Sequence, residues 1–86
     1  MGEAKKSNFE IAVADKVADM RRLKGLSQSD LATMLEVTRG FIGQVESPNS
    51  PSSYSLDHLN RIAFELNCSV HDLLPSTPIV ENGWDK

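Results

Sequence analysis

Residues 20–46 read MRRLKGLSQSDLATMLEVTRGFIGQVE, and this stretch decides the fold. It contains two short segments with apolar residues at helical spacing, and each follows a residue that can cap a helix. Ser27 can cap the first segment together with Asp30, in the reciprocal arrangement of a capping box. Thr38 can cap the second segment, which we expect to run through Glu46. The stretch therefore predicts two short helices joined by a tight turn.

Two helices this short cannot enclose a core, so the flanking sequence must supply further helices. A capping box in front of an apolar helical pattern predicts a first helix over about 9–24. The Pro- and Ser-rich segment 47–53 predicts a loop, after which a helix is expected from Ser55 to about Asn67. A last short helix is expected from Ser69 to Pro75. The fold class is then all-α: five helices, of which the second and third form a helix-turn-helix. The positions expected to face inward are Phe9, Val13, Val17, Met20, Leu31, Met34, Leu35, either Phe41 or Ile42, Val45, Leu56, Leu59, Ile62, Ala63 and Leu66.

Length and helix boundaries predict one domain, since 86 residues provide material for one modest core. We expect a flexible N-terminal segment at 1–8, the helical domain at 9–75 and a C-terminal tail at 76–86. The tail contains Ile79, Val80 and Trp84. Two interpretations of it stay open, a disordered end and a contribution to a dimer surface.

Composition argues against several classes of protein. No apolar run approaches the roughly 20 residues of a membrane span, and the first residues lack a signal peptide, so we expect no membrane partner and a cytoplasmic location. One cysteine and two histidines offer neither an internal disulfide nor a zinc ligand set, so no metal and no cofactor are expected. There is no glycine-rich phosphate loop, and no Cys or Ser has a credible base. We therefore expect no enzymatic activity.

The charge balance is acidic, with nine basic and twelve acidic residues and a formal net charge of −3. Residues 9–75 alone contain six basic and nine acidic residues, which again gives −3. Proteins that bind nucleic acid are usually basic. Any attraction to phosphate must therefore be local.

Several stretches of the chain match the sequence pattern of a known family in residue type and spacing. They are Met20 to Gln28, Leu31-Ala32, Val37 to Glu46, Leu59, Ile62-Ala63, Leu66 and Leu73-Leu74-Pro75. Over about residues 9–75 the chain resembles the XRE family, the phage repressor and Cro-type helix-turn-helix DNA-binding domains. The resemblance implies a five-helix, lambda-repressor-like domain. It also implies a transcriptional regulator, a repressor in the favoured interpretation, that binds double-stranded DNA in a sequence-specific way. Weak binding to one half-site, together with the habit of the family, favours a homodimer on a palindromic site. The chain is short and shows no sensor domain, so no small-molecule ligand is expected.

The resemblance also assigns roles to individual residues. It implies that the helix at 38–46 enters the major groove, where Arg39 could contact guanine, Gln44 adenine and Phe41 a thymine methyl group. An alternative for Phe41 is that it turns inward and packs. Thr38 and Gln28 are implied to contact phosphate, and Ser27, which caps the same turn as Gln28, is counted with the DNA-binding residues. Gly40 is a point of close approach, and Arg22 and Lys24 are possible backbone contacts. An ion pair of Arg21 with Glu46 is implied to fix the recognition helix, and the alternative is two separate surface charges. The two glycines, Gly40 and Gly43, are alternatively sequence drift that the helix tolerates.

Three features depart from the family pattern. Glu36 stands where the family usually has glycine in a left-handed turn, the loop at 47–53 is longer and lacks Lys and Arg, and the net charge is negative. These departures predict weak binding per monomer and a shallow salt dependence. They also keep an alternative open, a helix-turn-helix-derived protein-interaction module, antitoxin-like or adaptor, with little or no DNA binding.

Overall fold

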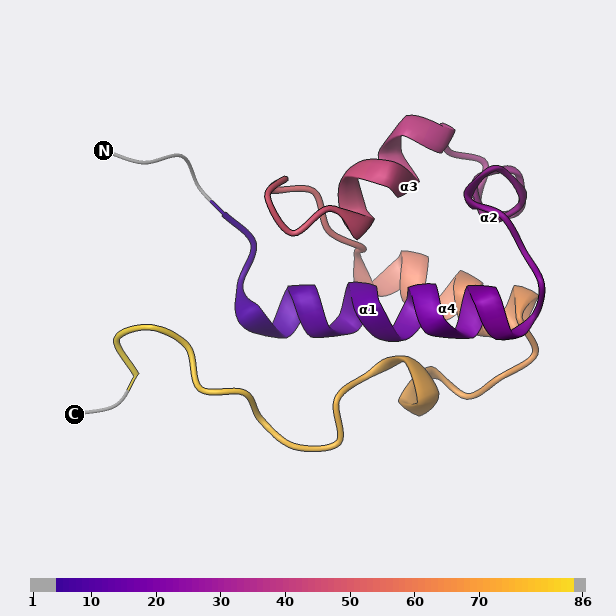
Figure 1. The fold of residues 1–86 in the computed structure, drawn as a ribbon. Coiled ribbons are helices and arrows are strands. Elements are labelled where there is room, and N and C mark those ends of the chain that lie inside the picture. Colours follow the sequence, from indigo (N-terminus) through magenta and orange to yellow (C-terminus); the bar gives the residue numbers. More distant parts are fainter. Residues whose placement is uncertain (1–4, 85–86) are drawn as a thin grey trace.

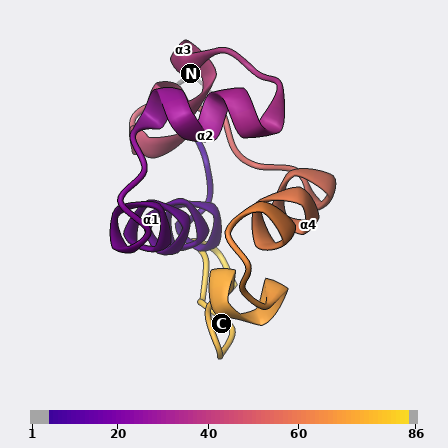
Figure 2. The ribbon, with the colours of Figure 1, turned by 90° about the vertical axis from the view of Figure 1, so that its right-hand side faces the viewer.

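The computed structural model describes residues 5–84. Its elements are α1 (Asn8–Leu23), α2 (Gln28–Leu35), α3 (Arg39–Glu46), α4 (Leu56–Glu65) and a 3-10 turn, η1 (Val70–Leu73). Helices α2 and α3 form an upper layer over α1 and α4, and η1 lies on the other side of this lower layer (Figures 1 and 2). The predicted all-α fold with a helix-turn-helix is confirmed.

The α-helices begin where the sequence places their caps, because each cap satisfies backbone N–H groups that the helix itself leaves unpaired. The Ser7, Ser27 and Ser55 hydroxyls each accept a hydrogen bond from the backbone N–H three residues later, and the side chain at that position accepts from the cap's own N–H. Thr38 caps α3 by accepting from the backbone N–H of Phe41. Local sequence thus sets the start of every α-helix.

Three details of the predicted bundle are wrong. Phe9 was expected to face inward, but it lies in the first turn of α1 and is 36% exposed. The fifth helix is a 3-10 turn of four residues, because little chain lies between its cap Ser69 and Pro75, which cannot continue a helix. Leu56 was expected on the inner face of α4, yet it is 83% exposed. It occupies the first position of α4, whereas Leu59 and Ile62 in the later turns are buried.

The core draws fully buried side chains from all the helices. The largest of them are Val17, Leu31, Ile42, Val45, Ile62 and Leu73. Helix α3 contributes Ile42 and Val45 from its inner face, and it packs against both α1 and α2. Burial of these two side chains holds one face of α3 against the bundle and leaves the opposite face in solvent.

The turn between α2 and α3 has the left-handed backbone that the family resemblance implies at Glu36. Glu36 ends α2 with φ 59° and ψ 42°, and its N–H donates to carbonyls of the preceding turn. A side chain with a Cβ atom is strained in this region, whereas glycine is not. We therefore expect Glu36→Gly to raise the free energy of unfolding by about 1 kcal/mol.

Thermal and urea unfolding measure this effect, and Asn67→Gly is the matched control. Asn67 has φ 55°, but asparagine tolerates the left-handed region, so its replacement should gain less. A lower melting temperature for Glu36→Gly than for the wild type would contradict the strain argument.

Both ends of the described chain meet the start of α1. Residues 1–4, half of the segment expected to be flexible, lie outside the described residues, whereas Lys6 is buried. In the tail, residues 76–84 form no helix or strand, but the Glu81 carboxylate accepts hydrogen bonds from the backbone N–H groups of Asn8 and Phe9 at 2.9 and 2.8 Å. A carboxylate at the positive end of a helix dipole is stabilising, so Glu81 ties the tail to α1.

Within residues 5–84, no helix combines the length and apolar character needed to cross a bilayer. Nor does any group of three or more His, Cys, Asp and Glu side chains in this part of the chain have an arrangement suited to a metal ion.

Candidate nucleic-acid interface

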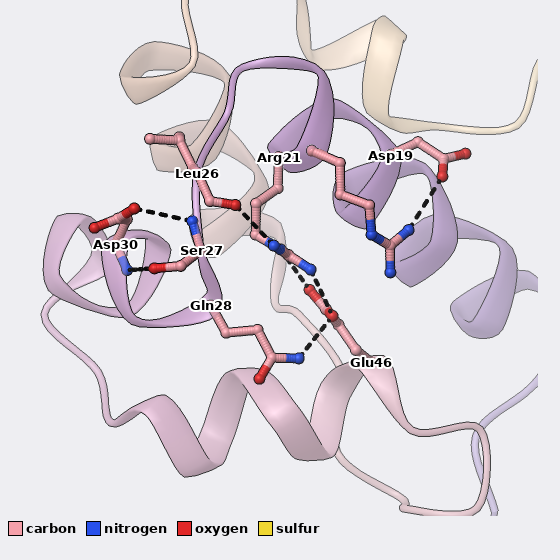
Figure 3. A network of polar contacts seen from close by, with 8 residues as sticks. Asp19, Arg21, Leu26, Ser27, Gln28, Asp30 and Glu46 are labelled. Carbon is pink, nitrogen blue, oxygen red and sulfur yellow. Dashed lines mark hydrogen bonds and ion pairs between the residues drawn. The ribbon is translucent and has the colours of Figure 1, made fainter.

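A buried ion pair joins the end of α1 to the end of α3. The Arg21 guanidinium donates to both carboxylate oxygens of Glu46, Nε to Oε2 at 3.0 Å and Nη2 to Oε1 at 3.1 Å, while Nη1 donates to the backbone carbonyl of Leu26 at 2.8 Å (Figure 3). Arg21 is only 7% exposed. The structure thus brings together the two residues for which the resemblance implies an ion pair, and the two-point geometry orients as well as attracts.

Gln28, the first residue of α2, joins the same network. Its Nε2 donates to Glu46 Oε1 at 2.9 Å, so the carboxylate is bound from both α1 and α2 (Figure 3). The resemblance implies a phosphate contact for this glutamine. Here one amide hydrogen is used for Glu46, and the second remains as a donor on a half-buried side chain.

The outer face of α3 presents Arg39 and Gln44, both exposed as expected. Arg39 has no side-chain hydrogen bond or ion pair with any of residues 5–84, so its guanidinium is available to a partner. Gln44 Oε1 accepts from the Ser52 hydroxyl at 3.2 Å, which leaves its amide donors unused by that contact. These two side chains are the polar, extended groups on the solvent side of the helix.

Neither glycine of α3 is required by the protein's own packing. A Cβ atom on Gly40 would lie 3.9 Å from the Thr38 hydroxyl, and one on Gly43 would lie 3.7 Å from Gln28 Oε1. Both are ordinary contact distances. Glycine costs a helix about 1 kcal/mol relative to alanine, and alanine would fit at both positions. The packing of the protein itself therefore does not explain the two glycines of α3.

Phe41 takes the inward alternative. Its ring is half-buried and lies 6.2 Å from the Tyr54 ring in an edge-to-face arrangement and 5.4 Å from the His58 ring. The Tyr54 side chain is partly buried with its hydroxyl oxygen enclosed, and this burial raises the pKa of its phenol. The aromatic cluster thus supports α3 from the α4 side.

The cap residues keep a donor for an outside partner. The hydroxyl oxygens of Ser27 and Thr38 accept bonds from the N–H groups of Asp30 and Phe41 at 3.0 and 3.1 Å. Because a hydroxyl accepts through its oxygen while its hydrogen stays free, both exposed residues can still donate to phosphate.

The two residues considered for backbone contacts lie at the end of α1 and just beyond it. Arg22 and Lys24 are exposed, and Arg22 pairs with Asp19 at 3.5 Å. An exposed pair of this kind is weak and easily exchanged for another anion. The single acidic residue of α3, Glu46, is neutralised by Arg21, so Arg39 supplies the exposed charge of that helix.

The caps, helical periodicity and motifs of the sequence did not indicate that Lys6 also contacts α3. Its Nζ donates to the backbone carbonyls of Val45 at 2.6 Å and Gln44 at 3.2 Å. No motif or periodicity marks a lysine that lies outside any helix, and its role depends on a contact across 39 residues of sequence.

Two short helices around a left-handed turn, with the second helix buried on one side and polar on the other, define the helix-turn-helix class of DNA-binding domain. Residues 16–78 match the family described as the Cro/C1-type HTH DNA-binding domain. The chain belongs to this family. No curated protein matches it.

Solved structures agree with this assignment. The restriction-modification controller protein C.AhdI from Aeromonas hydrophila has 26% identity and a TM-score of 0.64, over 74% of this chain and 94% of that one. A transcriptional regulator of the HTH_3 family from Vibrio cholerae has 28% identity and a TM-score of 0.65, over 76% of this chain and 35% of that one.

An enzyme is also among the similar structures, the hydroxypropylphosphonic acid epoxidase from S. wedmorenis. It has 24% identity and a TM-score of 0.70, over 81% of this chain. This chain spans only 36% of the epoxidase, so the likeness concerns the fold of that part and does not extend to the reaction.

Proposed function

We propose that the chain is a sequence-specific transcriptional regulator, most simply a repressor, that inserts α3 into the major groove of double-stranded DNA. The observation that carries this proposal is the two-sided character of α3. Ile42 and Val45 are fully buried, while Arg39 and Gln44 on the other side are exposed, and Arg39 has no partner among residues 5–84. Arginine can donate two bonds to guanine, and glutamine can pair in the same way with adenine.

Phosphate contacts complete the interface. Ser27 and Thr38 offer hydroxyl donors, and Gln28 offers its second amide hydrogen. Arg22 and Lys24, at the end of α1 and just beyond it, offer exposed positive charge. Gly40 and Gly43 leave room for bases or backbone to approach α3, which would account for two glycines that the free protein does not need. Phe41 supports α3 from the α4 side, and only the exposed part of its half-buried ring is available to a thymine methyl group.

Two copies of the chain are proposed to bind together. With few positive charges near α3 and a net charge of −3, the affinity of one domain should be modest. A symmetric dimer on a palindrome joins two modest contacts into one strong contact, provided that the half-sites lie about 34 Å apart.

Selection of bound duplexes from a random DNA library at low salt tests the proposal. We expect enrichment of a palindrome whose half-sites are centred about 10 base pairs apart and contain a guanine and an adenine at neighbouring positions. The salt slope of binding to the selected site should be shallow for a DNA-binding protein. A library that stays random through repeated rounds would refute sequence-specific binding.

A second function, a protein-interaction module, is favoured by the negative charge and by exposed apolar side chains outside α3. The largest exposures belong to Leu23, Leu56 and Phe64. The two functions predict different results for the Arg39→Ala substitution. If Arg39→Ala changes no DNA affinity while binding of a protein partner persists, this second function replaces the first.

A further inference from the structure

Lys6 is a buried cation at the C-terminal end of α3. It is 6% exposed, and its Nζ lies 2.6 Å from the Val45 carbonyl oxygen and 3.2 Å from that of Gln44. Burial lowers the pKa of this amine, although the charges of Glu10 and Asp15 act in the opposite direction. Lysine is rarely buried without compensation, so its contacts must be specific enough to offset the loss of water.

The end of α3 needs such a donor. The last carbonyls of a helix have no partner inside it, and the helix dipole places partial negative charge there. Helix α3 has no basic residue in its last turn, and within residues 5–84 the Ser47 N–H is the backbone donor that caps it, through the Gln44 carbonyl. Lys6 supplies a charged donor from a different part of the chain.

The backbone around Lys6 is itself held in place. Lys6 directly precedes Ser7, which caps α1 reciprocally with Glu10. Glu10 also accepts from the Ser53 hydroxyl at 3.0 Å and so joins the loop that follows α3. Glu81 adds its two bonds to the first N–H groups of α1. The backbone that follows Lys6 is thus held by the cap of α1, by the loop after α3 and by the tail, so the position of α1 sets the position of Lys6.

From this geometry we infer that Lys6 is a positioning residue for the recognition helix. Arg21 holds the side chain of Glu46, Lys6 holds the backbone carbonyls of Gln44 and Val45, and both come from α1 or the residue before its cap. These two contacts act on different groups in the last turn of α3, the Glu46 side chain and the backbone, and they add to the packing of Ile42 and Val45 in resisting rotation of the helix. They fix the angle at which Arg39 and Gln44 meet the bases, a consequence that rests on the proposed function.

A direct phosphate contact is the competing role for a lysine at the edge of a DNA-binding domain, and salt dependence separates the two roles. A lysine that neutralises phosphate contributes about one unit to the slope of log affinity against log salt. A positioning lysine contributes to affinity and base discrimination without changing that slope.

The test compares Lys6→Met with Lys5→Met, since Lys5 is adjacent, exposed and equally charged. Binding is measured on the selected site and on single-base mismatches, well below the melting temperature of each variant. We expect Lys6→Met to weaken binding about tenfold, with reduced mismatch discrimination and an unchanged salt slope, and Lys6→Arg to recover most of the affinity. Lys5→Met should leave discrimination unchanged.

Two results of the binding measurement would overturn the inference: unchanged affinity and discrimination in Lys6→Met, or a salt slope reduced by about one unit. A second measurement does not require DNA. Hydrogen exchange of the amides of residues 45–47 should accelerate in Lys6→Met while that of residues 31–35 in α2 stays as in the wild type. Unchanged exchange at residues 45–47 would disprove the anchoring even if DNA binding failed for another reason, and accelerated exchange without DNA binding would count against the proposed function alone.

Discussion

Arg21→Met is expected to lower the free energy of unfolding by about 3 kcal/mol. The substitution removes the guanidinium that binds both oxygens of Glu46 and the carbonyl of Leu26, and leaves that carboxylate in a site where only about a tenth of its side-chain surface is exposed. Gln28 would remain as its side-chain partner among residues 5–84. Breaking a buried pair from one side costs more than the pair contributes, because the remaining charge is poorly solvated.

Urea unfolding measures this loss, and Arg22→Met is the matched control on the same helix. The Arg22 pair with Asp19 has a distance of 3.5 Å and both side chains are largely exposed, so its removal should change stability by well under about 1 kcal/mol. Equal losses in the two variants would mean that the Arg21 network does not hold α3.

Arg39→Ala is expected to reduce affinity for the selected DNA by about 1–3 kcal/mol per half-site and to flatten preference at one base pair. Arginine donates two parallel bonds to guanine, and alanine can make neither. Because Arg39 has no side-chain partner within residues 5–84, the melting temperature should remain that of the wild type.

Arg61→Ala serves as the control for charge. Arg61 is also an exposed arginine, but it lies on α4 and pairs with Glu65 at 2.7 Å. The Arg61→Ala substitution should weaken DNA binding slightly, if at all, and by the same factor for every DNA sequence. If Arg39→Ala also weakened all sequences alike, Arg39 would be a phosphate contact and base recognition would have to come from Gln44 or another residue.

The buried network also bears on the acidic charge of the chain. Glu46 would repel phosphate if it stood alone at the end of α3, and the Arg21 pair removes that repulsion without placing positive charge on the surface. The local field at α3 is therefore more favourable to DNA than the net charge of −3 suggests.

The sequence by itself determined the helix starts and the inner face of α3, and the family resemblance implied the left-handed turn at Glu36. Ser7, Ser27, Thr38 and Ser55 act on N–H groups three residues away. Such features depend on residues within one or two helical turns, so a single stretch of chain contains their causes.

Only the tertiary structure decided which side chains hold α3 from outside. Lys6 reaches the end of α3 across 39 residues and Glu81 reaches the start of α1 across 73, while Phe41 turns toward Tyr54 and His58 and Leu56 projects into solvent. Each outcome depends on which element lies opposite, and a periodic pattern gives the face of a helix without giving its neighbour. Packing therefore assigns the anchors of the recognition helix, and local sequence builds the helix itself.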